Sequence, residues 1–571
     1  MGRAIFHCTE QVIFAIILNA FFSIYLRRVE LRGRGLTLSK DTFLRGAFIL
    51  TAAGIIVKVI GSVNRILLSR LLGGEGIGLY QMAYPIYLLA LSVSSAGIPV
   101  AISIIVAEKI ARSDYRGANR VFRISLFVLA ITGILFTFLL YFGAGWLIEH
   151  HFVRDSRAYY AIAALSPAIF FVTVLSSYRG YFQGLQMMTP TAVSQIFEQL
   201  LRVITMIVFA YMLLPYGLEY AAAGASFGAG PGAAAGLLVL LYYYWKQRHV
   251  RQYQIDTQPD LKQESSYSIV SRIVKLALPV SLANIMLPVV SNIDLLIVPA
   301  RLEAAGYTVE QATELFGYLT GMAVALINLP TILTASLAAS LVPAVSEAFT
   351  LGDRQRIFQR TATAMRISNF ITIPAFAGMC LLATPISQML YGTPNAGVSI
   401  AILSVGIVLL GIHQVTTGVL QGLGHTAIPL INMVVSAVVK VILSWWLTAI
   451  PSLGIKGAAW ATNADFGVAA LLNMYFVYRY IGFSINIKDT VKTVIATITM
   501  GAAVLLTYDT VMTHTFHNTL STLIAIVVGG SVYGIVLLMV GGISERDIER
   551  MPRIGGKVVA VLQKVGLLRR K

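Results

Sequence analysis

Long apolar runs separated by short polar loops dominate the chain from about residue 45 to about residue 542. A helix needs about 20 consecutive apolar residues to cross the hydrocarbon core of a bilayer. About 14 runs approach or exceed this length. They lie near 45–72, 79–106, 122–148, 158–178, 189–215, 221–245, 270–299, 315–345, 367–391, 398–420, 427–449, 455–478, 491–512 and 519–542. The pattern predicts an all-α polytopic membrane protein of about 14 transmembrane helices.

The composition agrees with a membrane protein. Hydrophobic residues make up 57% of the chain and charged residues only 12%, and the mean hydropathy is +0.77. Soluble globular domains carry about twice that share of charged residues. We therefore expect most of the chain to lie in lipid.

The net charge of +18 comes mainly from alternate loops and the chain ends. Lys and Arg gather before the first run, at position 179, and in the segments 109–123, 246–275, 354–366, 479–492 and 546–571. Loops rich in Lys and Arg stay in the cytoplasm, so both ends of the helical core are predicted to be cytoplasmic. Attraction to anionic membrane lipids accounts for this charge, and no nucleic-acid partner is expected.

A weak internal repeat runs through the chain. Gln183 and Gln421 lie in similar segments 238 positions apart, and Arg202 and Lys440 follow them at the same spacing. The segment 106–123 likewise resembles 345–362. Six runs make up each copy, so both copies have one orientation in the membrane. A parallel repeat of this kind implies two pseudo-symmetric lobes, an axis along the membrane normal, and a site between the lobes.

The repeat divides the chain into parts. We expect an N-lobe of six helices at 38–250, a C-lobe of six helices at 251–482, and two further helices at 483–545. Residues 546–571 are predicted to be a basic amphipathic tail on the inner leaflet. Residues 1–37 hold an apolar stretch shorter than a normal span. They are interpreted as a membrane anchor, an extra span or a mis-assigned start.

Two cations interrupt the first apolar run. Lys58 and Arg65 are seven positions apart, so a helix places them on one face together with Gly54 and Gly61. No acidic residue lies within a helical turn of either cation. A cation at the bilayer centre costs about 2.5 to 3.5 kcal/mol. These residues therefore indicate a polar cavity, whereas Arg70 at the end of the run can reach the membrane edge.

Glu198, Asp294 and Asp465 lie inside other runs. Glu198 and Arg202 are four positions apart, which suits a helical ion pair. Glu198 has two possible roles. It lowers the cost of burying Arg202, or Arg202 faces the cavity and Glu198 adjusts its electrostatic environment. Three alternatives are open for Asp294 and Asp465. Each carboxyl group stays protonated, pairs with a cation, or binds a coupling ion. The substrate-binding candidates are thus Lys58, Arg65, Arg70, Glu198 and Arg202, with Asp294 and Asp465 as ion-coupling candidates.

Several segments resemble the stage V sporulation protein B family. They are FLRGAFILTAAGIIVKVIGSVNRILLSRLLGGEGIGLYQMAYP, GIPVAISIIVAEKIARSDYRGA, RGYFQGLQMMTPTAVSQIFEQLLRVI and LPYGLEYAAAGA, and the resemblance covers about residues 38–545. The family is similar to the lipid II flippases of the MurJ type, within the multidrug/oligosaccharidyl-lipid/polysaccharide exporter superfamily. The resemblance implies a two-lobed, V-shaped cavity and export of a peptidoglycan precursor for the spore cortex.

One departure from the MurJ-type pattern concerns its charged residues. That pattern carries cations on spans 1, 2 and 8. Here Lys58 matches a span 1 cation, but spans 2 and 8 have no arginine at the corresponding places. The resemblance therefore leaves open a different lipid-linked saccharide as substrate.

Other function classes fit the sequence less well. An exporter of organic cations should place acids, not Lys58, Arg65 and Arg202, in its first lobe. A membrane enzyme would need a catalytic cluster on a sizeable loop, and the longest interior loop, about 246–269, has none. No Gly-rich phosphate loop for ATP is found, so no cofactor is expected. Cys8 and Cys380 form no metal motif, and no metal is expected.

The favoured function is therefore a flippase that moves an undecaprenyl-linked peptidoglycan precursor of the lipid II type across the cytoplasmic membrane by alternating access. The expected partners are the lipid-linked saccharide pyrophosphate, anionic lipids and enzymes of cell-wall synthesis. The alternatives are a flippase for another surface polysaccharide, a drug exporter, and a non-catalytic scaffold for wall enzymes.

Overall fold

The computed structural model describes residues 40–95, 97–259 and 263–542. The chain divides into two units, Met1–Ile49 and Leu50–Lys571, and everything reported below lies in the second. The expectations for residues 1–37 and for the tail at 546–571 fall outside the described residues. All regular elements of the described chain are helices, which confirms the predicted all-α class.

The helices follow one another through short connections. In chain order they are α2 (Lys40–Ser95), α3 (Ile98–Ala111), α4 (Tyr115–Glu149), α5 (Ala158–Gly184), α6 (Met188–Leu213), η1 (Leu214–Tyr216), α7 (Leu218–Phe227), α8 (Ala229–Lys246), α9 (Arg248–Thr257), α10 (Ser266–Ala304), α11 (Val309–Phe316), the π-helix η2 (Gly317–Ala323), α12 (Val324–Thr350), α13 (Arg354–Leu381), α14 (Ala383–Tyr391), α15 (Gly397–Leu403), α16 (Val405–Gly422), α17 (Ala427–Leu447), α18 (Ile455–Ile481), α19 (Ile487–Thr515) and α20 (Asn518–Met539).

Twelve helical segments of the described chain are long and apolar enough to cross a membrane. The first, Ile49–Ala111, covers the first two predicted spans. The predicted span at 455–478 coincides with α18, a helix that is not among the twelve. The predicted spans thus all correspond to helices, although the apolar segments number twelve.

Two of the predicted spans illustrate how their limits differ in the structure. The span expected at 367–391 is part of α13, which begins at Arg354, and a separate short helix, α14, follows it. The span expected at 158–178 continues as α5 to Gly184. Arg179, which we expected in a loop, is therefore a helical residue.

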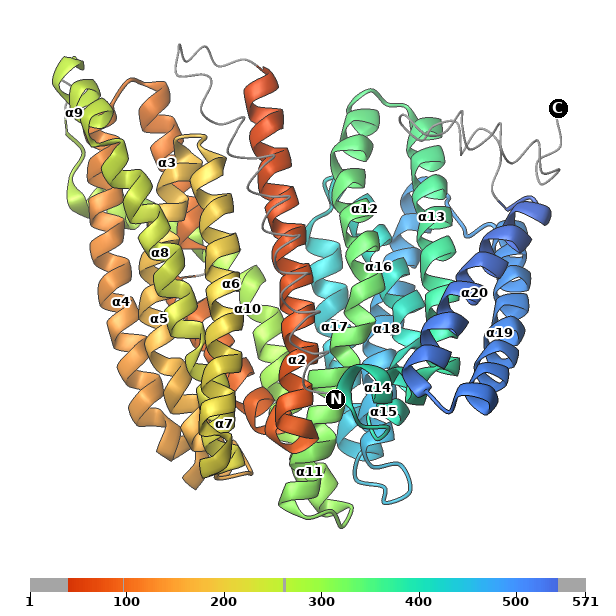
Figure 1. Cartoon of the computed structure of the whole chain (residues 1–571). Helices are drawn as coiled ribbons and strands as arrows, with labels where there is room; N and C mark the ends of the chain where they lie inside the picture. Colours follow the sequence, from red (N-terminus) through yellow and green to blue (C-terminus); the bar gives the residue numbers. More distant parts are fainter. Residues whose placement is uncertain (1–39, 96, 260–262, 543–571) are drawn as a thin grey trace. The chain divides into compact units, whose positions relative to one another are not determined.

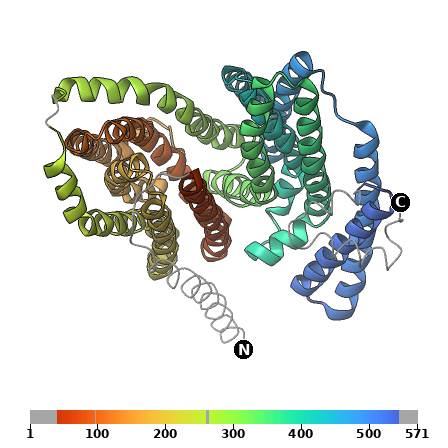
Figure 2. The same cartoon turned by 90° about the horizontal axis from the view of Figure 1, so that it is seen from above.

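The helices gather into two bundles (Figure 1). In the first, α4 and α5 pack closely together, as do α6 and α8, while α3 and α7 both contact α5. In the second, α12 packs on α16, α17 on α18, and α19 on both α20 and α13. α10 contacts α3 and α4 of the first bundle and α17 and α18 of the second, so it runs between the two (Figure 2).

Glycine contacts repeat between the bundles at the spacing of the sequence repeat. A methyl group added to Gly180 of α5 would lie 2.7 Å from the carbonyl oxygen of Pro99. One added to Gly418 of α16 would lie 2.7 Å from the carbonyl oxygen of Ala338. Both pairs are related by the 238- or 239-residue spacing. The same close helix approach is therefore built twice, in α3–α5 and in α12–α16.

A kink divides α2 into the two predicted spans. Gly73 has φ 68°, ψ −171°, a conformation that residues with a side chain rarely adopt. The helix then packs tightly on α11 and η2. A methyl group on Gly78 would lie 2.1 Å from the carbonyl oxygen of Thr313, and one on Gly317 would lie 2.1 Å from that of Gly74. Only glycines allow these backbones to meet so closely.

Polar contacts reinforce this junction. The buried carboxylate of Asp155 accepts hydrogen bonds from Thr313 Oγ1 of α11, at 2.9 Å, and from the guanidinium group of Arg157. Arg157 also pairs with Glu75 of α2 at 2.6 Å. The hydrogen bonds to Asp155 raise the pKa of Arg157, so it stays charged. The two bundles are thus fastened together where α2 bends.

Candidate functional site

A cavity of about 460 Å³ lies between helices of the two bundles. α2 contributes the part around Lys58 and Arg65 and the tyrosines beyond its kink, and the first bundle contributes α6. The second contributes α12, through residues such as Asn328 and Thr331, and Gln414 of α16. The cavity therefore lies where a parallel repeat is expected to hold its substrate.

Three of the predicted cations line this one cavity: Lys58, Arg65 and Arg202. The shared face of Lys58 and Arg65 turns toward it as the seven-residue spacing predicts. Gly54 has open space beside it, and Gly61 lies against the side chain of Gln199. These glycines keep the helical face around the two cations free of bulky side chains.

Lys58 and Arg65 have no acidic partner. Within residues 40–95, 97–259 and 263–542, neither side chain forms an ion pair or a hydrogen bond. Lys58 is exposed and Arg65 is half-buried. Two cations that face a common cavity without a counter-charge attract an anion.

Arg202 has a different environment because Glu198 lies one turn before it. The guanidinium Nη2 donates to Glu198 Oε1 at 2.6 Å, and the other carboxylate oxygen accepts from Arg179 Nη2 of α5 at 2.8 Å. All three side chains are largely buried. Arg202 Nε is buried and has no partner among the described residues. One acid therefore serves two arginines, and the cluster keeps a net positive charge beside the cavity.

Arg70, the remaining cationic candidate, does not line the cavity. Its Nε donates to the carbonyl oxygen of Leu390 at 2.7 Å, and its Nη2 donates to that of Met389. These carbonyls lie in the last turn of α14, whose negative dipole end favours a cation. In this structure Arg70 joins α2 to α14.

The rest of the cavity wall is aromatic and polar. Tyr80 and Tyr84 follow each other on α2, and their rings stack with centroids 5.5 Å apart. Three amide side chains, those of Gln199, Asn328 and Gln414, share the wall with them. Such groups can hydrogen-bond a neutral, hydroxyl-rich ligand and pack against its apolar faces.

Asp294 and Asp465 lie away from this cavity, in the second bundle. Asp294 of α10 accepts from Lys440 Nζ of α17 at 2.6 Å. Asp465 of α18 accepts from Ser436 Oγ, also at 2.6 Å. Ser436 and Lys440 are one turn apart on α17, so the two acids contact the same helical face. Asp294 is therefore ion-paired in this structure.

The repeat relates the two buried ion pairs. Arg202 on α6 and Lys440 on α17 occupy equivalent positions, and each is paired with an acid. Sequence reasoning identified this equivalence but missed two partners. Arg179 was missed because α5 continues past the end of its apolar run. Lys440 was not recognised as the partner of Asp294 because 146 residues separate them.

The described residues hold no group of three or more His, Cys, Asp or Glu side chains that could bind a metal ion. Of the two cysteines, Cys380 is free and Cys8 lies outside the described residues. The expectation of no metal site and no cofactor stays a prediction.

Comparison with known proteins places this architecture in a family. The profile described as "Polysaccharide biosynthesis protein" matches residues 43–349, and that described as "MatE" matches residues 317–446. The chain is 31% identical to the stage V sporulation protein B of Bacillus subtilis strain 168, over 91% of this chain and all of that protein. It is 28% identical to the lipid II flippase MurJ of the same organism, over 86% and 94% of the two chains.

A solved structure shares the fold. The lipid II flippase MurJ in an inward closed conformation aligns with a TM-score of 0.63 and 17% identity. The alignment covers 86% of this chain and 98% of that one. Since the identity is low, this likeness supports the arrangement of helices alone.

The shared carboxylate leads to a prediction about stability. Glu198→Gln should lower the free energy of unfolding by about 3 kcal/mol, because two largely buried arginines lose their counter-charge. Combining it with Arg179→Gln should restore part of the loss, since one unpaired charge then disappears. Thermal unfolding of the purified variants in detergent measures both effects.

Glu219→Gln is the matched control, because Glu219 has no ion pair with any described residue. It should unfold like the unsubstituted protein. Equal stability of the Glu198→Gln variant and this control would show that the two arginines do not depend on Glu198.

Proposed function

Because the chain belongs to the stage V sporulation protein B family, we propose that it is a flippase for a lipid-linked peptidoglycan precursor of the lipid II type, acting in spore cortex synthesis. The relatives named as a sporulation protein and as a lipid II flippase support this proposal. The lobes at 38–250 and 251–482 alternate in opening the cavity to the two sides of the membrane.

The observation that carries the proposal is the cavity with Lys58, Arg65 and Arg202 in its wall. A lipid-linked precursor carries a pyrophosphate, which must cross the membrane with its negative charges. Arginine offers a bidentate fork to phosphate oxygens, and lysine a point charge. The unpaired state of Lys58 and Arg65 leaves both available for this role, and Arg202 adds a third positive charge to the wall.

The neutral part of the wall suits the saccharide of such a precursor. The stacked rings of Tyr80 and Tyr84 offer faces for the apolar side of a sugar. The amides of Gln199, Asn328 and Gln414 offer donors and acceptors for its hydroxyl groups. The pyrophosphate and the sugar would thus meet different parts of one cavity.

The MatE match over residues 317–446 raises the alternative of a drug exporter. An exporter of organic cations needs acids in its cavity, because like charges repel the substrate. Here the ionisable side chains in the wall are three cations and two tyrosines. The charge of the cavity favours an anionic substrate. We likewise propose a transporter rather than an enzyme, with no cofactor.

We propose that the protein lies in the cytoplasmic membrane of a bacterium, with both ends of the helical core in the cytoplasm. Anionic lipids bind its basic loops, and enzymes of cell-wall synthesis are expected partners. Single cysteines at Asn395 and His517 should then react with a membrane-impermeant maleimide added to intact cells. A cysteine at Asp114 should react only after the cells are opened. The reverse result at any two sites would contradict this orientation.

The substitution Arg65→Ala tests the substrate site. We expect it to abolish flipping while protein level and melting temperature stay close to those of the parent, because Arg65 has no described partner to lose. Arg65→Lys should rescue part of the activity, since the charge remains but the bidentate fork is lost. The assay measures the side of the membrane on which the lipid-linked precursor accumulates in cells, alongside a membrane-level blot.

Arg70→Ala is a useful comparison because Arg70 contacts α14 and not the cavity. It should affect stability more than substrate affinity. Full flipping activity in a well-expressed Lys58→Ala, Arg65→Ala double variant would refute the role of these cations in binding.

We further propose that Asp294 and Asp465 couple flipping to an ion gradient. In the present state the Lys440 ammonium group occupies the position on Asp294 that the coupling ion takes. Asp294→Asn and Asp465→Asn should then remove the dependence of flipping on the proton or sodium gradient, measured in vesicles with each gradient imposed separately. Glu219→Gln should leave that dependence unchanged. Unaltered ion dependence in both aspartate variants would exclude them as the coupling site.

A further inference from the structure

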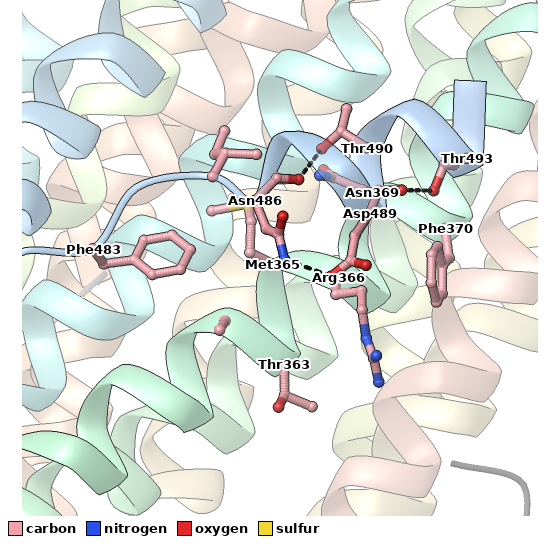
Figure 3. Close-up of a pocket in the computed structure, with 12 residues that line it drawn as sticks. Thr363, Met365, Arg366, Asn369, Phe370, Phe483, Asn486, Asp489, Thr490 and Thr493 are labelled. Carbon is pink, nitrogen blue, oxygen red and sulfur yellow. Dashed lines mark hydrogen bonds between the residues drawn. The ribbon is translucent and has the colours of Figure 1, made fainter. Parts of the chain in front are cut away.

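A second, smaller cavity lies in the second bundle, away from the cations of the first. Its volume is about 190 Å³, less than half that of the transport cavity. The middle of α13 and the first turns of α19 form its walls, and the connection between α18 and α19 contributes Phe483 (Figure 3). No residue of the proposed transport site lines it.

The cavity contains a buried polar atom without a partner. Asn369 of α13 is 6% exposed, and its Oδ1 accepts no hydrogen bond from any described residue. A buried carbonyl oxygen without a donor destabilises the folded state, because the oxygen loses its water and gains no partner. Asn369 lines the cavity, so a ligand that enters with an N–H or O–H group can supply the missing donor.

Both signs of charge line the same cavity. Asp489 lies in the first turn of α19 and accepts from Asn486 Nδ2 at 3.0 Å. Arg366 of α13 lies over the ring of Phe370, with its guanidinium carbon 5.8 Å from the ring centroid. The carboxylate and the orphan Asn369 oxygen suit an ammonium group, and the guanidinium group suits a phosphate. The lining is therefore complementary to a small zwitterion.

The position of the cavity points to a lipid. α19 carries an apolar stripe on its outer face at Ile487, Val491, Ile495 and Ile498, whose exposed fractions are 75%, 48%, 45% and 67%. These positions recur with helical periodicity, and a face of this kind contacts acyl chains. The stripe begins in the same turn as Asp489. The cavity thus lies where the lipid-facing surface ends, which is the level of the head groups.

We propose that this cavity binds the head group of an aminophospholipid such as phosphatidylethanolamine. The ammonium group donates to Asn369 Oδ1 and pairs with Asp489, while the phosphate faces Arg366 and the acyl chains follow the apolar stripe of α19. An anionic lipid such as phosphatidylglycerol can donate a hydroxyl group to the Asn369 oxygen, but it has no ammonium group to pair with Asp489. Phosphatidylcholine carries the same charges but has no N–H group to donate.

Native mass spectrometry of the full chain, released from nanodiscs with equal amounts of phosphatidylethanolamine, phosphatidylglycerol and phosphatidylcholine, tests the proposal. We expect phosphatidylethanolamine to be retained about tenfold over the other two, because it alone makes the charge-assisted hydrogen bonds. Asp489→Asn and Asn369→Leu should remove this preference. Asp509→Asn, which changes an exposed acid near the other end of α19, should keep it.

A melting temperature for each variant shows that it is folded. If the Asn369→Leu variant is not folded, the Asp489→Asn variant decides the question, because the Asp489 side chain is less buried than that of Asn369. Equal retention of the three lipids, or a preference that survives Asp489→Asn, would overturn the proposal. If soluble phosphoethanolamine binds as well as the lipid does, the cavity is not a site for a lipid head group. The readout is lipid retention, so it does not depend on flipping.

Discussion

The cost of placing a cation inside a membrane is the constraint on which this structure depends. On equivalent helices of the two bundles, a buried cation is paired with an acid: Arg202 on α6 and Lys440 on α17. Arg202 shares Glu198 with Arg179, whereas Lys440 is paired with Asp294 from α10. The pairs remove most of the penalty for an isolated charge. They also hold α6 against α5 and α17 against α10. The contacts that neutralise the charges are therefore also contacts that pack the helices together.

Lys58 and Arg65 are the exception to this arrangement. No described residue neutralises them, and they face the cavity. Their charge can remain only where water or an anion reaches them. The anionic substrate that we propose would replace a solvation that the membrane does not offer. In this structure Arg202 and Lys440 are paired with acids, whereas Lys58 and Arg65 stay unpaired in the wall of the cavity between the bundles.

Much of this could be predicted from the sequence, for physical reasons. Apolar length identifies membrane helices reliably because lipid offers no hydrogen-bond partners to an unfolded backbone. The seven-residue spacing of Lys58 and Arg65 placed both on one face because a helix has a fixed period. The repeat could be read from short matches because similar glycine contacts, such as those of Gly180 and Gly418, constrain both copies.

Other features were beyond sequence reasoning because they depend on distant contacts. The end of an apolar run is a poor guide to the end of its helix when a charged residue such as Arg179 finds a buried partner. Nothing local joins Asp294 to Lys440, and the carbonyl groups that bind Arg70 belong to the end of a helix far along the chain. Arg70 was therefore grouped with the cavity cations, although its contacts in this structure are with α14.

The junction at the kink of α2 is the contact that the proposed alternating access would have to open. There, glycines bring α2 against α11 and η2, and the Asp155–Thr313 hydrogen bond joins the two bundles. A ligand shifts a conformational equilibrium only by its difference in affinity for the two states. Opening this junction separates closely packed backbones and breaks buried hydrogen bonds. The anion that we propose to bind at Lys58 and Arg65 of α2 and Arg202 of α6 would act on the same helix that closes the junction. The unpaired cations and the close glycine contacts thus lie on one element, α2, so the binding that we propose at Lys58 and Arg65 would act on the helix that forms the junction.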